Sequence, residues 1–566
     1  MNGKNMNEVK NNQRICVIGL DGATLDLIEP WIQKGKLPTL KKLISNGTKG
    51  RLRSAIPPIT APAWSSFITG KNPGKHGLYD FIARRPGTYQ TRPFNASDRN
   101  GESLWSLLSR AGKRVTILNV PMTYPPEPVN GFMVSGMGTP ATVDDFCYPK
   151  EIIHDLRRVV PNYEVQNEGI FDPRGREHQM LQAVQKMTAM RQQTVRHFLT
   201  QAEWDFFMVV FMATDWLQHY FWHYMDESHP CHDPEAPAIL KNAILDCYRQ
   251  IDDCLGEILD CLDDDTLVII MSDHGFGPQE KYLHVNTWLW ENGYLHFKST
   301  AQTRLKETLF KSGITPLNIY EFLRRLGKSR TVAQNLRQRK ESVREAVNRM
   351  FLSFNDVDWG RTRAYSVGNI GPIYVNLKGR EPEGAVEPGH EYDDLVAELT
   401  DALFRLRDPI SGDQIVEHVY RREEVFHGDH LTDAPDLLFL PRDMKYIGYG
   451  LLQFSSNHWL AASDRSGGHR MDGLLLMHGS GVRTGHELAS ARIIDLAPTI
   501  LAAMGVPVPT DMDGQVLTNA FVEDIQVTMQ VGYQAPKQDA AAQAIDLSAK
   551  DEDEILERLR GLGYVE

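Results

Sequence analysis

The chain has 566 residues, of which 42% are hydrophobic and 24% charged, and these ordinary globular values exclude a largely disordered protein. A formal net charge of −12 gives no support to a nucleic-acid-binding surface, which would need clustered Lys and Arg. The length exceeds what one hydrophobic core usually needs, so two or three structural units are expected.

The beginning of the chain predicts neither a signal peptide nor a membrane anchor. Residues 1–13 are polar and are predicted to form a flexible N-terminus, because no apolar segment precedes the first strand-like run. The whole chain lacks a run of about 18 apolar residues, so no membrane span is expected. Six cysteines in so long a chain do not indicate a disulfide framework, and we expect a cytoplasmic protein.

Apolar runs and helical patterns alternate along the first half of the chain. Buried strands are predicted at residues 15–20, 114–120, 204–212 and 266–271, and helices at about 215–225 and 238–262. This alternation predicts an α/β fold with a mostly parallel central sheet sandwiched by helices. Functional residues in such sheets lie beyond the carboxyl ends of the strands, where Asp21, Asp215 and Asp273 fall.

The second half of the chain predicts an insertion and then a return to the sheet. Residues 297–350 are rich in Lys, Arg and Gln and are predicted to form a helical insertion or cap. Strand character returns at residues 363–377, 436–440 and 473–478, and residues 487–505 are predicted to be a helix. We therefore expect one α/β domain from residues 14–296 and 351–525, followed by a C-terminal tail at 526–566 that contains a short helix.

Two residues of the first half could bear negative charge at a reaction centre. Thr60, in Pro57-Pro-Ile-Thr60-Ala-Pro62, precedes a helix-like segment whose N-terminal dipole would stabilise an anion. A simple helix N-cap is the alternative interpretation of Thr60. Asp21 follows the first strand and precedes a glycine, and a turn-forming Asp is the alternative there.

Three further clusters carry potential metal ligands. Asp215 and His219 are four residues apart, so on a helix they share one face and can bind one ion; their apolar neighbours argue against an ordinary surface pair. Asp273 and His274 directly follow the predicted strand at 266–271. His469 lies in a predicted glycine-rich turn, Ser466 to Gly473.

The order of these clusters resembles the alkaline phosphatase superfamily, and most closely its type I phosphodiesterase/nucleotide pyrophosphatase branch. Pro58-Ile-Thr60-Ala-Pro62, running on to Ile68-Thr-Gly70, looks like the nucleophile region of that branch. Asn119-Val-Pro-Met-Thr-Tyr-Pro-Pro126 is similar to a prokaryotic subgroup of predicted phosphohydrolases or phosphomutases.

The resemblance implies two divalent metal ions around a threonine nucleophile. It implies one site of Asp215, His219 and His469, and a second of Asp21, Asp273 and His274 with Thr60 bridging toward it. The mixed nitrogen and oxygen ligands favour Zn²⁺, with Mn²⁺ as an alternative. A metal-dependent phosphodiesterase with a phosphothreonine intermediate on Thr60 is expected.

The substrate is expected to be a small phosphoester, such as a nucleotide, a lipid headgroup or a glycan phosphodiester. A phosphomonoesterase, or a phosphotransferase or phosphomutase with the same nucleophile, is the alternative, and a non-catalytic binding protein is a third hypothesis. A sulfatase is disfavoured, because the string Thr60-Ala-Pro62-Ala-Trp64 lacks the Cys or Ser and the Arg of the sulfatase motif. The sequence leaves open whether the protein forms a homo-oligomer.

Three residues are predicted to contact the substrate. Trp64 lies close to the nucleophile in the sequence, and its apolar ring would suit a diester. Asn95 is assigned the place of an amide that the branch uses on a phosphoryl oxygen, because His76 to Phe81 contains no Asn. Asn286 belongs to His284-Val-Asn286-Thr-Trp288, which is predicted to line the pocket; a structural helix cap is the alternative for Asn286.

Overall fold

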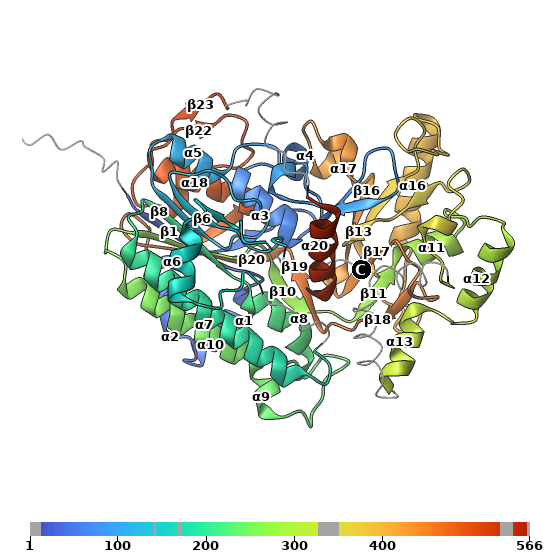
Figure 1. Ribbon diagram of the computed structural model, residues 1–566, viewed down its shortest axis with the longest axis horizontal. Helices are drawn as coiled ribbons and strands as arrows, with labels where there is room; N and C mark the ends of the chain where they lie inside the picture. The colour runs from blue at the N-terminus through green and yellow to red at the C-terminus, as the bar shows by residue number, and fades with distance from the viewer. Residues whose placement is uncertain (1–12, 141–142, 167–172, 326–349, 533–546, 563–566) are drawn as a thin grey trace, which may run out of the picture.

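A nine-stranded sheet forms the centre of the larger of two units in the computed structural model, which describes residues 13–140, 143–166, 173–325, 350–532 and 547–562 (Figure 1). Its strand order is β21-β2-β20-β9-β1-β8-β5-β6-β7. The bounds are β1 (Ile15–Leu20), β2 (Thr48–Arg53), β5 (Val115–Leu118), β6 (Gly131–Val134), β7 (Cys147–Tyr148), β8 (Phe206–Phe211), β9 (Leu267–Met271), β20 (Asp472–His478) and β21 (His486–Arg492). The central strands β9, β1, β8, β5 and β6 run parallel, which confirms the predicted α/β fold.

Helices cover both faces of this sheet (Figure 1). One face carries α2 (Pro38–Ser45), α7 (Glu177–Gln201) and α10 (Ala243–Asp260), and the other carries α3 (Thr60–Thr69), α5 (Leu104–Arg110) and α18 (Leu496–Ala503). Further elements of this unit are α1 (Leu25–Gln33), α4 (Pro73–His76), α6 (Ile152–Val159), α9 (Ala238–Lys241), β22 (Val508–Pro509) and β23 (Met529–Gln530). The predicted helix at 238–262 is thus divided between α9 and α10 at Asn242.

The predicted helix at 487–505 was wrong in its first half. Residues His486–Arg492 form β21, which adds to β2 as the edge strand of the sheet, and the helix α18 begins only at Leu496. Leu488 and Ala491 are its buried apolar residues, and their spacing of three imitates a helical period. Backbone pairing with β2 overrides that local pattern.

The smaller unit contains two four-stranded sheets and a separate apolar core, with buried residues between Leu283 and Phe454. One sheet has the order β13-β17-β11-β18 and the other β12-β14-β16-β15. Their bounds are β11 (Lys281–His284), β12 (Ala364–Tyr365), β13 (Gly368–Asn369), β14 (Pro372–Val375), β15 (Val416–Arg421), β16 (Leu437–Pro441), β17 (Tyr446–Gly450) and β18 (Leu460–Ala462). Its helices are α11 (Val285–Glu291), α12 (Ala301–Lys311), α13 (Pro316–Arg325), α16 (His390–Phe404) and α17 (Arg422–Val425).

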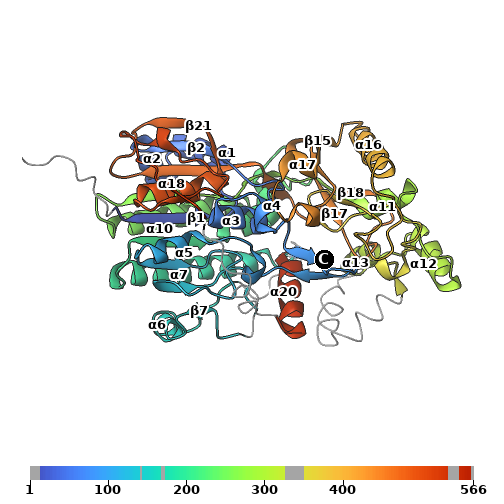
Figure 2. The same ribbon diagram turned by 90° about the horizontal axis from the view of Figure 1, so that it is seen from above.

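The predicted insertion at 297–350 contributes α12 and α13 to this smaller unit, and residues 326–349 lie outside the described part of the chain. The smaller unit lies beside the larger one in both views, and α20 (Ala549–Leu562) lies between them (Figures 1 and 2). Ile555 and Leu559 of α20 are buried, and Arg558 donates a hydrogen bond to the carbonyl of Thr139. A short C-terminal helix was predicted; residues 1–12 of the predicted flexible N-terminus and 533–546 of the tail lie outside the described residues. Within the described ranges, no helix is both long and apolar enough to cross a membrane.

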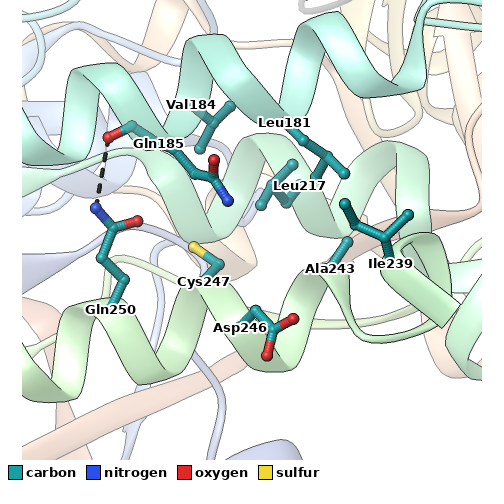
Figure 3. Close-up of a pocket in the computed structure, with 9 residues that line it drawn as sticks. All are labelled: Leu181, Val184, Gln185, Leu217, Ile239, Ala243, Asp246, Cys247 and Gln250. Atoms are coloured by element: carbon teal, nitrogen blue, oxygen red, sulfur yellow. Dashed lines mark hydrogen bonds between the residues drawn. The ribbon is translucent and has the colours of Figure 1, made fainter.

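Helix α8 (Ala213–Met225) follows β8, and the apolar side of α8 that carries Leu217 packs against α7 and α10 (Figure 3). Leu217 points between α7 and α10, where Leu181, Val184, Ala243 and Cys247 surround a cavity of only about 30 Å³. Leu217 is two residues from both Asp215 and His219, so it lies on the opposite side of the helix from them. Burial of Leu217 therefore turns Asp215 and His219 toward the carboxyl edge of the sheet.

Candidate metal centre and nucleophile

Three buried histidines present the same ring nitrogen to one centre. In each ring Nδ1 lies within hydrogen-bond distance of a backbone carbonyl: Gly467 for His219 (2.9 Å), Pro58 for His469 (2.9 Å) and Gly275 for His274 (3.1 Å). A carbonyl only accepts hydrogen bonds, so Nδ1 carries the proton and Nε2 keeps a lone pair. The Nε2 atoms of His219 and His469 face each other at 3.1 Å, which is the arrangement of two ligands directed at one cation.

Carboxylate oxygens complete two overlapping groups of potential ligand atoms. Asp215, His219 and His469 offer atoms within 4.8 Å of one another, and so do Asp21, Asp215 and His274. Asp215 thus belongs to both groups, whereas the resemblance implied it for one site only. Asp273 lies beside the second group, with Oδ2 3.3 Å from Nε2 of His274.

Two of these carboxylate oxygens have no hydrogen-bond partner among the described residues. They are Oδ1 of Asp21 and Oδ2 of Asp273, and both residues are completely buried. Burying a carboxylate oxygen without a partner costs free energy of folding. Such oxygens are therefore rare in natural proteins, and those that occur often bind a cation. The donor set therefore fits divalent metal ions.

Thr60 is the first residue of α3 and its hydroxyl faces this centre. Thr60 Oγ lies 3.4 Å from Nε2 of His274, and the side chain is completely buried. The helix N-cap is Ile59, so the alternative interpretation of Thr60 as an N-cap was wrong. The positive end of the α3 dipole points at the space next to the hydroxyl, where an anionic group would be stabilised.

The backbone of the strand that carries His469 lies directly against α8, the helix that carries His219. β19 (Gly467–Arg470) pairs with β10 (Gly275–Pro278), which directly follows His274, so His469 lies in a strand rather than in the predicted turn. A Cβ atom on Gly467 would lie 2.2 Å from the carbonyl oxygen of Gln218 in α8. Glycine is therefore required before His469, and the Gly-Gly pair was the sequence signal for this contact.

Burial and mutual repulsion shift the acid–base equilibria of these groups. Burial, together with the negative charges of Asp273 and Asp215, raises the pKa of Asp21 well above its ordinary value. Burial and Asp215 raise the pKa of Asp273 to about 8. Burial lowers the pKa of His219 to about 4 and that of His274 well below its usual range, so both imidazoles are neutral near pH 7. Neutral imidazoles are the protonation state that a metal site requires, and a bound cation would displace the protons that the raised pKa values keep on the carboxyl groups.

A family model described as type I phosphodiesterase / nucleotide pyrophosphatase matches residues 15–453. The chain belongs to this family. The family match indicates phosphoester hydrolysis as the class of reaction and places the protein in the alkaline phosphatase superfamily, as the sequence motifs predicted. A search of curated proteins found no match.

Two solved structures are similar to this phosphodiesterase-family protein. Phosphonoacetate hydrolase from Sinorhizobium meliloti, in complex with phosphonoformate, is 14% identical, with a TM-score of 0.51 over 88% of this chain and 96% of that chain. Human ectonucleotide pyrophosphatase / phosphodiesterase 5 is 12% identical, with a TM-score of 0.49 over 90% of this chain and all of that chain (100%). At 14% identity the likeness to the phosphonoacetate hydrolase concerns the fold alone.

The three predicted substrate contacts have structural partners in this family member. Trp64 is completely buried, and its Nε1 donates to Oδ2 of Asp21 at 3.0 Å, so it orients a carboxylate from behind. Asn95 caps the short helix after it by accepting from the Ser97 amide. Asn286 bonds through its amide to the backbone of Ser366 and Leu451. These three side chains thus support the surrounding structure, and a role for them in substrate contact stays a prediction.

Metal removal is expected to make the stability of the protein depend on pH between about 6.5 and 8. The folded metal-free protein keeps a proton on Asp273 up to about pH 8, whereas the unfolded chain loses it near pH 4. Stability from that proton is therefore complete below pH 4, falls by about 1.4 kcal/mol per pH unit, and is lost above pH 8. Below about pH 6.5 the histidines oppose this trend, because unfolding lets them gain protons.

Thermal unfolding with a chelator and with excess Zn²⁺, at pH 6.5 and at pH 8, measures this effect. The zinc-induced rise in the unfolding midpoint should be larger at pH 8, because there the cation competes with fewer protons for the carboxylates than at pH 6.5. An equal rise at both pH values would contradict the raised pKa of Asp273.

Proposed function

We propose that this protein is a two-metal phosphodiesterase that cleaves its substrate through a phosphothreonine intermediate on Thr60. One observation carries the proposal: the lone-pair nitrogens of three histidines and the carboxylates of Asp21, Asp215 and Asp273 converge beside the Thr60 hydroxyl. Asp215, His219 and His469 would hold one ion, and Asp21, Asp273 and His274 the other. Neutral imidazole and carboxylate ligands support Zn²⁺ as the metal.

Bound cations would lower the pKa of the Thr60 hydroxyl and offset negative charge on the phosphoryl oxygens. The Thr60 oxygen then forms a bond to phosphorus as the bond to the leaving oxygen breaks. The hydroxyl proton passes to solvent, and the departing alkoxide takes up a proton from solvent to leave as the alcohol. The N-terminus of α3 stabilises the charge that the phosphoryl oxygens carry. Water hydrolyses the phosphothreonine, which releases the phosphomonoester and restores Thr60.

The chain's own residues hold these groups in place before the substrate binds. Trp64 fixes Asp21 by its indole N–H, and the backbone carbonyls of Gly467, Pro58 and Gly275 fix the histidine rings. Such outer contacts orient ligands and are needed for catalysis at metal sites. The carboxyl edge of the sheet is thus arranged for in-line displacement at phosphorus.

Turnover of bis(p-nitrophenyl) phosphate against p-nitrophenyl phosphate tests the proposal in the zinc-loaded protein. We expect kcat/KM to be at least about tenfold higher for the diester, because no Arg closely follows Thr60 in the sequence to bind a dianionic monoester at the nucleophile. A preference for the monoester would instead indicate a phosphomonoesterase or a phosphotransferase. Absence of both turnover and bound metal would overturn the proposal.

A further inference from the structure

The sheet β13-β17-β11-β18 of the smaller unit turns one face toward the larger unit. Leu283 of β11 and Tyr446 of β17 are buried in the core of the smaller unit. Side chains alternate along a strand, so Tyr282 and His284 of β11 point the other way. Tyr282 and Tyr449 pack instead against the core of the larger unit, which carries the metal centre.

The polar residues of this face form one row across three strands. Tyr449 is the register partner of His284 in β11 and of Asn369 in β13, so the three side chains share a face. At one end of the row, the backbone N–H and side-chain amide of Asn369 donate to Asp80 at 2.6 and 3.0 Å. Asp80 follows the nucleophile helix α3 and α4, so the row extends from the nucleophile segment to His284.

Arg465 lies between this row and the candidate metal ligands. Only 6% of Arg465 is exposed, and its neighbour Ser466 donates to the carbonyl of His219 at 2.8 Å. The guanidinium lies 5.7 Å from the ring centre of Tyr220, the residue after His219. Burial lowers the pKa of Arg465, but nearby Tyr220, Tyr449 and Tyr282 and the carboxylate of Asp464 raise it well above its ordinary value. One buried positive charge is thus close both to the metal centre and to the tyrosines of the row.

His284 supplies an independent sign of a ligand. It is 6% exposed, and neither ring nitrogen has a hydrogen-bond partner among the residues that the structure describes. A buried imidazole without a partner costs stability, because desolvation of both nitrogens is not compensated. A group that binds at this face would supply the missing partner.

We propose that Arg465, Tyr282, Tyr449 and His284, which we call the distal wall, bind a second anionic group of the substrate. This inference rests on the proposed function: the substrate is a phosphodiester whose non-reacting ester substituent carries its own phosphate or carboxylate. A buried guanidinium binds such an anion through charge-assisted hydrogen bonds, and the Tyr449 phenol and the His284 imidazole add neutral donors. The Tyr282 hydroxyl donates to Asp464 at 2.5 Å, so Tyr282 helps to hold the wall in place. The wall would therefore select charged diesters over neutral ones of the same reactivity.

Three p-nitrophenyl diesters test the distal wall, with ethyl, carboxymethyl and 2-phosphoethyl as the second substituent. All three share the reacting phosphate and the leaving group. In the zinc-loaded protein we expect kcat/KM for one anionic diester to exceed that for the ethyl diester at least about tenfold. The preferred anionic substituent then identifies a phosphate or a carboxylate as the ligand. Equal values for the three diesters would overturn the inference and leave the proposed function intact.

Single substitutions in the distal wall distinguish a role in substrate binding from a role in stabilising the fold. Arg465→Gln should lower kcat/KM about 100-fold for the preferred diester and less than about threefold for the ethyl diester. His284→Leu should lower it about tenfold without lowering the unfolding midpoint, because the substitution removes an unpartnered buried polar group. Tyr446→Phe is the matched control on the other face of β17 and should leave the preference unchanged. An equal loss on all diesters in Arg465→Gln would show a structural role and overturn the inference.

Calorimetric binding to the zinc-loaded Thr60→Ala variant provides a readout that does not depend on turnover. The preferred anionic diester should bind at least about tenfold more tightly than the ethyl diester. If none of the diesters turned over but this difference remained, the proposed reaction would be wrong and the anionic subsite supported. Equal affinities would overturn the subsite itself.

Discussion

Replacing Thr60 by alanine is expected to lower the turnover of bis(p-nitrophenyl) phosphate by at least about 10³-fold. The substitution removes the only protein atom that is proposed to bond to phosphorus, and loss of a nucleophile is among the largest effects of a single substitution on catalysis. Thr60→Ser should keep a large part of the activity, because a hydroxyl remains at the same place on α3. Steady-state kinetics of the three proteins, with Zn²⁺ in excess, measures the effect.

Metal content and a control on the same helix distinguish a lost nucleophile from a damaged site. The carboxylate and imidazole ligands are intact in Thr60→Ala, so bound zinc should stay close to two ions per chain. Thr69→Ala is the matched control: Thr69 is the last residue of α3, and its hydroxyl donates to the carbonyl of Ser65 and accepts from the backbone N–H of Lys71, away from the metal ligands. Thr69→Ala should retain activity within about threefold. Retention of more than a tenth of the activity in Thr60→Ala would exclude Thr60 as the nucleophile.

Replacing His219 by alanine should remove one bound metal ion and lower turnover by at least about 100-fold. His219 offers one of three ligand atoms of the group with Asp215 and His469, and two remaining ligands bind a divalent ion weakly. The second group does not contain His219 and should stay occupied. Elemental analysis after gel filtration should therefore give about one zinc ion per chain, against two in the unsubstituted protein.

His223→Ala is the matched control for this experiment. His223 lies one turn further along α8, is half-buried, and belongs to neither group of potential ligands. Its replacement should leave two zinc ions and nearly full activity. A His219→Ala protein that still carried two zinc ions would rule out the proposed ligand set at this position.

The long apolar runs of the sequence predicted the central sheet because those strands are buried on both faces. Residues 15–20, 206–211 and 267–271 have apolar side chains on both faces of each strand. Such runs are typical of the central strands of a parallel sheet, where helices cover both faces. The polar residue after each run then had to lie at the carboxyl edge. For this reason the positions of Asp21, Asp215 and Asp273 could be predicted from the sequence.

The smaller unit could not be predicted with the same detail. Its strands are short, such as the two-residue β12 and β13, and their pairing joins segments far apart in the chain. Asn286 shows the consequence: its partners Ser366 and Leu451 are 80 and 165 positions away, so local sequence gives no sign of them. The burial of Trp64 behind Asp21 and the place of Asp215 in both ligand groups likewise depend on tertiary packing.

The pairing of His219 with His469 has a consequence for the order in which the protein is made. These two rings are 250 positions apart, and the strands of the smaller unit lie in the intervening chain. During synthesis from the N-terminus, α8 emerges from the ribosome long before β19 does. The group of Asp215, His219 and His469 can therefore bind its ion only after the intervening polypeptide has emerged and strand β19 has packed against α8. Zinc uptake at this cluster would then mark the last stage of maturation of the enzyme, not its beginning.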